Sequence, residues 1–123
     1  MKPLIKKLDG EKEFFFQEGC HIIEVSNSED DHNLSIARAR VAPGVTTRWH
    51  RLRNTTERYA IISGEGMVEI GNIDHVKVCS GDVVVIPQMC PQRITNIGST
   101  DLEFFAICSP RFDESNYEDC EPA

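Results

Sequence analysis

The chain has 123 residues, which is enough for one domain with one hydrophobic core and too few for a multi-domain enzyme. Apolar residues make up 40% of the chain and charged residues 27%, as in ordinary globular proteins. The formal net charge of −7 disfavours nucleic acid as a partner, and no apolar run approaches the roughly 18 residues of a membrane span. We therefore expect one folded domain that binds neither nucleic acid nor membrane.

The five cysteines are widely scattered and include no CxxC pair. This spacing predicts neither a disulfide framework nor a zinc knuckle, and it is typical of free thiols in a reducing compartment. Residues 1–7 are basic and lack the apolar run of a secretory signal peptide. We expect a cytoplasmic protein.

Short β-rich runs follow one another along the chain. The predicted strands are residues 14–16, 21–25, 34–41, 59–62, 67–70, 76–78, 83–86, 92–96 and 102–107. Turn residues such as Pro43-Gly44 and Gly71-Asn72 separate them. No segment has a sustained apolar period of 3.6 residues. This pattern predicts an all-β fold, either an antiparallel sandwich or a barrel.

We divide the chain into three parts. Residues 1–33 are expected to form N-terminal strands and a loop that pack on the barrel, residues 34–112 the barrel, and residues 113–123 an acidic C-terminal tail. The run Phe14–Phe16 would place rings on both faces of a strand, which favours a covered strand edge and a homodimer. The composition of the tail favours a mobile segment over a lid.

A long spaced pattern begins at Gly44. It continues through His50 and Glu57 and ends at Gly64. It resembles the first signature of the cupin superfamily, which reads glycine, five residues, H-x-H, three or four residues, glutamate, six residues and glycine. The second histidine of that signature is replaced by Leu52.

A second pattern resembles the other cupin signature. Gly81, Pro87 and Asn96 occupy its glycine, proline and asparagine positions. Met89 stands where glycine is usual, and Gln92 stands where the third metal-binding histidine is usual. Together the two resemblances imply a double-stranded β-helix, the jelly-roll barrel of the cupins, that binds a small molecule.

The resemblance also implies a metal site inside the barrel. Residues two apart on a strand share a face, so strands that carry His50, Glu57 and Gln92 can converge on one interior point. One imidazole, one carboxylate and one amide oxygen would then hold a divalent ion such as Zn, Mn, Fe or Ni. Without a metal, His50 would hydrogen-bond Glu57, and Gln92 would line a pocket.

Three further residues are candidates for substrate binding, each with a plainer alternative. Arg48 shares the face of His50 and suits an anionic group, or it lies in solvent at the strand end. Tyr59 contacts the substrate or packs in the barrel. Asn96 contacts the substrate or fixes a turn.

Two classes of function remain open. In the first, a metal-dependent isomerase-type enzyme acts on a small oxygenated or sugar-like substrate, with His50 and Glu57 as catalytic residues that move a proton. In the second, the chain is a non-catalytic ligand-binding or sensor cupin, and Leu52 marks a degenerate metal site. The fold does not choose between them.

Overall fold

The structure, a computed structural model, describes residues 1–122 and is built almost entirely of β-strands. The strands are β1 (Phe14–Phe16), β2 (Cys20–Ser26), β3 (Ser35–Val41), β4 (His50–Leu52), β5 (Thr56–Ser63), β6 (Glu65–Ile70), β7 (Ile73–Cys79), β8 (Val83–Ile86), β9 (Gln92–Asn96), β10 (Leu102–Ser109) and β11 (Tyr117–Asp119). Single 3-10 turns lie at η1 (Gly10–Lys12), η2 (Glu29–Asp31) and η3 (Glu114–Asn116). No helix within residues 1–122 is long and apolar enough to span a membrane. The all-β prediction is confirmed.

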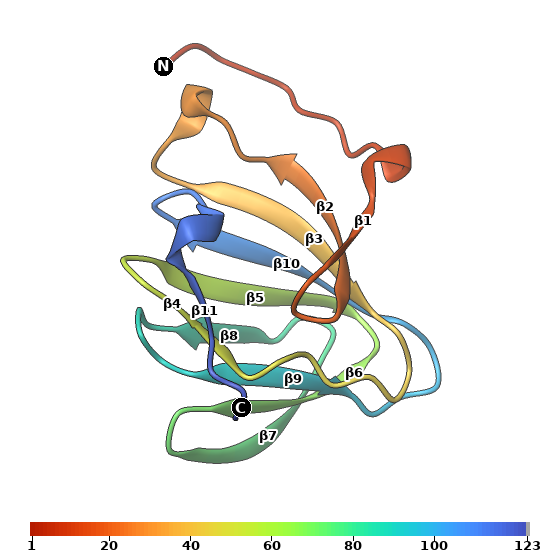
Figure 1. The fold of residues 1–123 in the computed structure, drawn as a ribbon. Helices are drawn as coiled ribbons and strands as arrows, with labels where there is room; N and C mark the ends of the chain where they lie inside the picture. The colour runs from red at the N-terminus through yellow and green to blue at the C-terminus, as the bar shows by residue number, and fades with distance from the viewer. Residues whose placement is uncertain (123) are drawn as a thin grey trace.

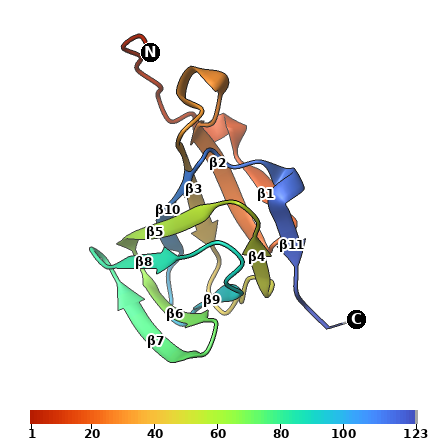
Figure 2. The ribbon, with the colours of Figure 1, turned by 90° about the vertical axis from the view of Figure 1, so that its left-hand side faces the viewer.

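The strands form two antiparallel sheets that face each other (Figure 1). The larger sheet has the order β1-β2-β3-β10-β5-β8, and the smaller has the order β11-β4-β9-β6-β7. The view in Figure 2 shows the two sheets curving around one interior, with β1 and β11 along the same side. This is the predicted jelly-roll arrangement.

Buried polar side chains lie at one end of the barrel interior, and buried apolar side chains fill the rest of it. In β5 the residues Glu57, Tyr59 and Ile61 are buried, and in β9 the buried residues are the alternate ones from Gln92 to Asn96. The apolar core between the sheets includes Val41, Val68, Ile94, Leu102 and Phe104. Alternation along the strands was readable from the sequence, and the burial of alternate residues agrees with it.

Two short strands were absent from the predicted runs. These are β4 and β11, each of three residues, and they pair with each other so that Tyr117 faces Leu52 and Asp119 faces His50. Three residues are too few to display an alternating pattern. Their pairing is therefore a feature of the tertiary structure.

The acidic C-terminal segment lies against the barrel, which differs from the mobile tail that its composition favoured. The Arg48 guanidinium lies 2.9 Å from the Asp119 carboxylate, and Arg51 Nε lies 2.9 Å from Glu118 Oε1. The backbone N–H of Cys120 donates to a carbonyl of the segment before β4. Acidic side chains of the tail thus pair with arginines of the segment around β4. With β11 paired to β4, the tail covers part of the barrel, which was the alternative to a mobile segment.

Two backbone conformations explain positions in the spaced patterns. Gly64 has φ +90°, and a Cβ there would lie 2.7 Å from the carbonyl oxygen of Asp101. No larger residue fits that approach. Met89 has φ 64°, in the left-handed region that favours glycine, at the position where the resemblance expects one. Met89 therefore holds a strained backbone.

Candidate functional site

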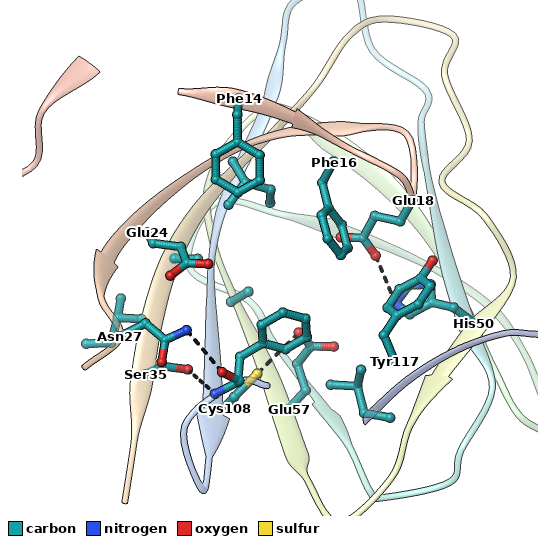
Figure 3. Close-up of a pocket in the computed structure, with 16 residues that line it drawn as sticks. Phe14, Phe16, Glu18, Glu24, Asn27, Ser35, His50, Glu57, Cys108 and Tyr117 are labelled. Carbon is teal, nitrogen blue, oxygen red and sulfur yellow. Dashed lines mark hydrogen bonds and ion pairs between the residues drawn. The ribbon is translucent and has the colours of Figure 1, made fainter. Parts of the chain in front are cut away.

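A cavity of about 60 Å³ lies at one end of the barrel, between the larger sheet, which includes β1, and the strands β4 and β11 of the smaller sheet (Figure 3). This volume has room for roughly five water-sized groups. Polar side chains reach it from four different segments: Glu18 after β1, His50 of β4, Glu57 of β5 and Tyr117 of β11. Titratable groups that converge on a cavity mark it as the candidate site.

His50 is fixed on both ring nitrogens. Its Nδ1 donates to the carbonyl oxygen of Arg48 over 2.7 Å, and its Nε2 lies 2.9 Å from Glu18 Oε2. The Tyr117 ring stacks on the imidazole with a centroid separation of 5.0 Å. Burial alone would lower the pKa of His50, but the charge and hydrogen bond of Glu18 outweigh it and raise that pKa to about 9. His50 is therefore an imidazolium at neutral pH.

Glu18 is the counter-charge of His50. Burial acts to raise the pKa of this carboxyl, and the charge and hydrogen bond of His50 lower it below its ordinary value of 4.5. The thiol of Cys20 also donates to Glu18 Oε1 over 3.1 Å. The two side chains form a buried ion pair on the cavity wall.

Glu57 lacks such a counter-charge. It accepts from Gln92 Nε2 over 3.1 Å and from the Cys108 thiol over 3.6 Å, and it is 8% exposed. Burial first, and then the negative charge of Glu18, raise the pKa of Glu57 to about 7. Glu18 and Glu57 thus have pKa values on opposite sides of the ordinary carboxyl value, a pattern found where one carboxylate stays charged and another carries protons.

Gln92 contacts His50, Glu57 and Tyr59 through its amide nitrogen. Its Nε2 lies 2.7 Å from His50 Nε2, 3.1 Å from Glu57 Oε1 and 2.8 Å from the Tyr59 hydroxyl. An amide nitrogen carries two hydrogens, and these serve Glu57 and Tyr59. A charged imidazole offers no acceptor, so the contact between Gln92 Nε2 and His50 Nε2 is not a hydrogen bond in this orientation of the amide. Gln92 Oε1 is buried and has no hydrogen-bond partner in the described chain.

The three predicted metal ligands meet. The Gln92 amide turns its nitrogen toward His50 and Glu57 in this structure, and a rotation of that amide by about 180° would turn its oxygen toward them. The Nε2 of His50 already faces Glu18, and Leu52 adds an apolar wall. Residues 1–122 contain no group of three or more His, Cys, Asp or Glu side chains arranged around an ion. With His50 engaged by Glu18 and Leu52 apolar, the described side chains form a hydrogen-bonded network, and metal ligation by His50, Glu57 and Gln92 stays a prediction.

Arg48, predicted to bind substrate, does not line the cavity. It precedes β4, and its half-exposed side chain pairs with Asp119 on the outside of the barrel. Its backbone carbonyl, and not its guanidinium, serves the site by holding His50. Tyr59 also lies outside the cavity wall, where its hydroxyl contacts Gln92.

Asn96, the third predicted substrate contact, is a structural residue. Its Nδ2 donates to the carbonyl oxygens of Val41 and Thr100, each over 2.8 Å, and its Oδ1 accepts from the N–H of Gly98 over 2.9 Å. The side chain is 1% exposed and does not line the cavity. It fixes the turn that leads into β10, as the plainer alternative held.

Sequence reasoning missed the N- and C-terminal contributions to the cavity. Phe14, Phe16 and Glu18 all line it. Strand alternation was a usable signal for Phe14 and Phe16, which share a face of β1, whereas Glu18 lies in the turn after that strand, where the alternation no longer applies. No comparable pattern predicts that Tyr117 lines the cavity, because Tyr117 lies in a short strand within a mainly acidic segment.

Comparison with known proteins agrees with this fold. A family model described as the cupin domain matches residues 37–108. An uncharacterized protein of Methanocaldococcus jannaschii is 29% identical over 123 residues, which cover 98% of this chain and 95% of the relative. An oxalate-binding protein of Thermotoga maritima is 34% identical over 83 residues, which cover 66% of this chain and 68% of the relative.

Solved structures give the same result for the fold alone. Pac13, a nucleoside dehydratase of Streptomyces, superposes with a TM-score of 0.77 at 17% identity, covering 96% of this chain and 92% of Pac13. KdgF from Halomonas superposes with a TM-score of 0.73 at 14% identity, covering 88% of this chain and 97% of KdgF. At such low identity these similarities concern the fold and not the chemistry.

Proposed function

The chain belongs to the cupin domain family, and on that premise we propose that it binds a small molecule in its cavity and moves a proton on that molecule without a metal ion. The observation that carries the proposal is that Glu18, His50 and Glu57 line one cavity. Buried titratable groups gathered in a cavity are a feature of sites that bind and transform small molecules.

Glu57 is the proton carrier in this proposal. Its pKa of about 7 suits a general acid or base near neutral pH. An isomerase-type reaction requires one group to remove a proton from the substrate and return it elsewhere, and Glu57 lines the cavity where such a substrate would lie. His50 remains an imidazolium held by Glu18 and the Arg48 carbonyl, and its role is to keep Glu18 charged and fixed beside Glu57.

The size of the cavity narrows the substrate. With room for roughly five water-sized groups, the cavity encloses a small oxygenated compound or one end of a larger one, and not a whole sugar ring. We therefore keep the oxygenated substrate of the sequence interpretation. A sugar-like ligand would have to project through the opening.

The test separates ligand binding from metal dependence. A fragment screen by thermal shift on chelator-treated protein, with each hit located by NMR, should give ligands that shift the signals of His50 and Tyr117. Adding Mn, Fe, Ni or Zn should not be required. A protein that binds these fragments only after metal is restored would contradict the proposal.

A non-catalytic binding or sensor module is the second candidate, and Leu52 favours it because an apolar residue lines the cavity where a ligand to metal would stand. The two candidate functions differ in whether carbon-bound protons of the ligand exchange with solvent. Incubating a bound ligand in D2O should place deuterium on its carbon if protons move, and Glu57→Gln should abolish the exchange. Glu69→Gln is the matched control, since Glu69 pairs with Arg93 outside the cavity. A ligand that binds without any exchange supports the sensor.

Leu52 also offers a gain-of-function test for the missing metal site. Leu52→His would add an imidazole to the wall beside His50 and Glu57. We expect this variant to retain a divalent metal after loading and desalting, whereas the parent should retain none. Stoichiometric metal in the loaded parent protein, lost in a His50→Ala variant, would refute the proposed independence from metal.

We also propose that the chain forms a homodimer. The support is strand β1 at the edge of the larger sheet, where Phe15 is 65% exposed and Phe14 is 43% exposed. Sedimentation velocity should give a dimer that Phe15→Ser weakens, and a monomeric parent would contradict this.

We place the protein in the cytoplasm on the support of five free cysteines.

A further inference from the structure

The cavity carries an excess of negative charge. Glu18, Glu24 and Glu57 line it, and within residues 1–122 the lining contains no lysine or arginine. His50 is the positive group on the wall, and its Nε2 lies 2.9 Å from Glu18 Oε2. Because that ion pair is internally balanced, the buried carboxyl of Glu57 is the group on the wall that remains to be compensated, while Glu24 is exposed to solvent.

Neither of these two carboxylates has a cation partner in the described chain. Glu24 and Glu57 form no ion pair among residues 1–122. Glu57 is 8% exposed, and burial together with the charge of Glu18 outweighs the attraction of His50 and raises the pKa of Glu57 to about 7. A cation bound beside it would favour the charged form of this carboxyl.

Aromatic rings form the apolar part of the same wall. The centroid of Phe16 lies 6.5 Å from that of Phe14, 6.1 Å from that of Phe112 and 5.4 Å from that of Tyr117. Figure 3 shows the rings of Phe14 and Phe16 pointing into the cavity on the side opposite Glu57. Aromatic rings attract cations within about 6 Å, most strongly where water is excluded.

The mouth of the cavity continues the same chemistry. A neighbouring surface depression shares Phe14, Phe16 and Glu24 with the cavity wall. It adds Asp113 and Glu114, and Arg111 is the one basic residue among its described lining residues. An acidic approach of this kind attracts cations and repels anions.

From the aromatic rings and the buried carboxyl of Glu57, which forms no ion pair, we infer that the cavity takes a small organic cation. The ammonium group of this ligand donates its N–H groups to Glu57, and its carbon chain lies against Phe14 and Phe16. The inference rests on the proposed function and narrows its ligand to a compound that carries an amine. An anion such as oxalate, which the Thermotoga maritima relative is named for binding, does not suit this site. A small oxygenated compound with an amine group does.

Three probes that share one carbon chain test the charge preference: butylammonium, 1-butanol and butyrate. The titrations are followed by NMR at about pH 7, where the amine is protonated and the butyrate is ionised. We expect butylammonium to shift the cavity signals and to bind about tenfold more tightly than 1-butanol, the factor that a cation–π and carboxylate contact supplies. Butyrate should not bind.

Two variants assign the effect to the cavity. Phe16→Leu keeps an apolar side chain and removes the ring, and Glu24→Gln removes an exposed charge that lines the cavity. Each should weaken butylammonium several-fold while leaving 1-butanol unchanged. Asp74→Asn is the matched control: it changes the net charge equally on β7, outside the cavity, and should have no effect.

The outcomes are distinguishable. If 1-butanol binds as tightly as butylammonium, or if potassium chloride at the same concentration causes the same shifts, the inferred cation class is wrong and the proposed function stands. If no probe and no fragment of the wider screen shifts the cavity signals, the proposed function itself is wrong. Selective loss of butylammonium binding in Phe16→Leu and Glu24→Gln supports the inference.

Discussion

Replacing Glu18 with glutamine removes the counter-charge of His50 and nearly preserves the size of the side chain. The His50 side chain is 2% exposed, and the ion pair raises its pKa from 6.5 to about 9. A change in the pKa of His50 from 6.5 to about 9 corresponds to about 3 kcal/mol. We expect Glu18→Gln to lower the free energy of unfolding by about 3 kcal/mol at about pH 6, and to bring the pKa of His50 below 6.5 because burial then dominates.

The sign of the pH dependence follows from linkage. A histidine with a raised pKa in the folded state stabilises the protein fully below its unfolded pKa of 6.5, and this stabilisation is lost as the pH rises through about 9. The parent and the Glu18→Gln variant should therefore differ most near pH 6. Their unfolding free energies should converge as the pH approaches 9 and passes it.

Two measurements check this prediction. An NMR titration of the His50 imidazole gives its pKa, and denaturant unfolding across the pH range gives the stability. Glu13→Gln is the matched control for the titration, because Glu13 pairs with Arg40 and His21 near the surface and its loss should leave the pKa of His50 unaffected. If His50 still titrates near 9 in Glu18→Gln, the ion pair is not the source of the shift and the reasoning fails.

Three further substitutions test the surrounding network and the backbone. Glu57 has a pKa raised from 4.5 to about 7, so the unfolding free energy of the parent should fall as the pH rises from about 4.5 to about 7. In Glu57→Gln the unfolding free energy should change less over this pH range. Met89→Gly relieves a φ of 64° and should raise the unfolding free energy by about 1 kcal/mol; an unchanged midpoint would mean that Met89 is not strained. Asn96→Ala leaves the carbonyls of Val41 and Thr100 without their donor and should cost about 2 kcal/mol in denaturant unfolding, whereas fragment binding in the cavity should not change.

The resemblance to two spaced patterns was enough to predict the fold and the meeting of three side chains. His50, Glu57 and Gln92 do lie in contact, although 35 residues separate Glu57 from Gln92. Glycine positions carried the same information, since the Cβ of any other residue at position 64 would meet the Asp101 backbone. These features are local in origin: the side on which a residue lies, and the turns that demand glycine, depend on near neighbours in the chain.

The chemical state of the site depended on contacts that no local pattern encodes. Metal ligation was implied by the resemblance, but the Nε2 of His50 faces Glu18, which no local pattern places there. Of the two interpretations of Arg48, the one that rested on its parity with His50 is wrong, because Arg48 precedes the strand and pairs with Asp119. Parity applies only within a strand, and the boundaries of a three-residue strand are not readable from composition.

The sequence by itself therefore determined the all-β barrel, its strand alternation and the interior positions of His50 and Glu57. Only the tertiary structure decided what surrounds them, because Glu18 and Tyr117 reach His50 from edge strands of different sheets, from the end of β1, which pairs with β2, and from β11, which pairs with β4. Strand spacing fixes the face on which a side chain lies. The partner across the barrel, and with it the charge of the imidazole, is set by how distant segments close over one cavity.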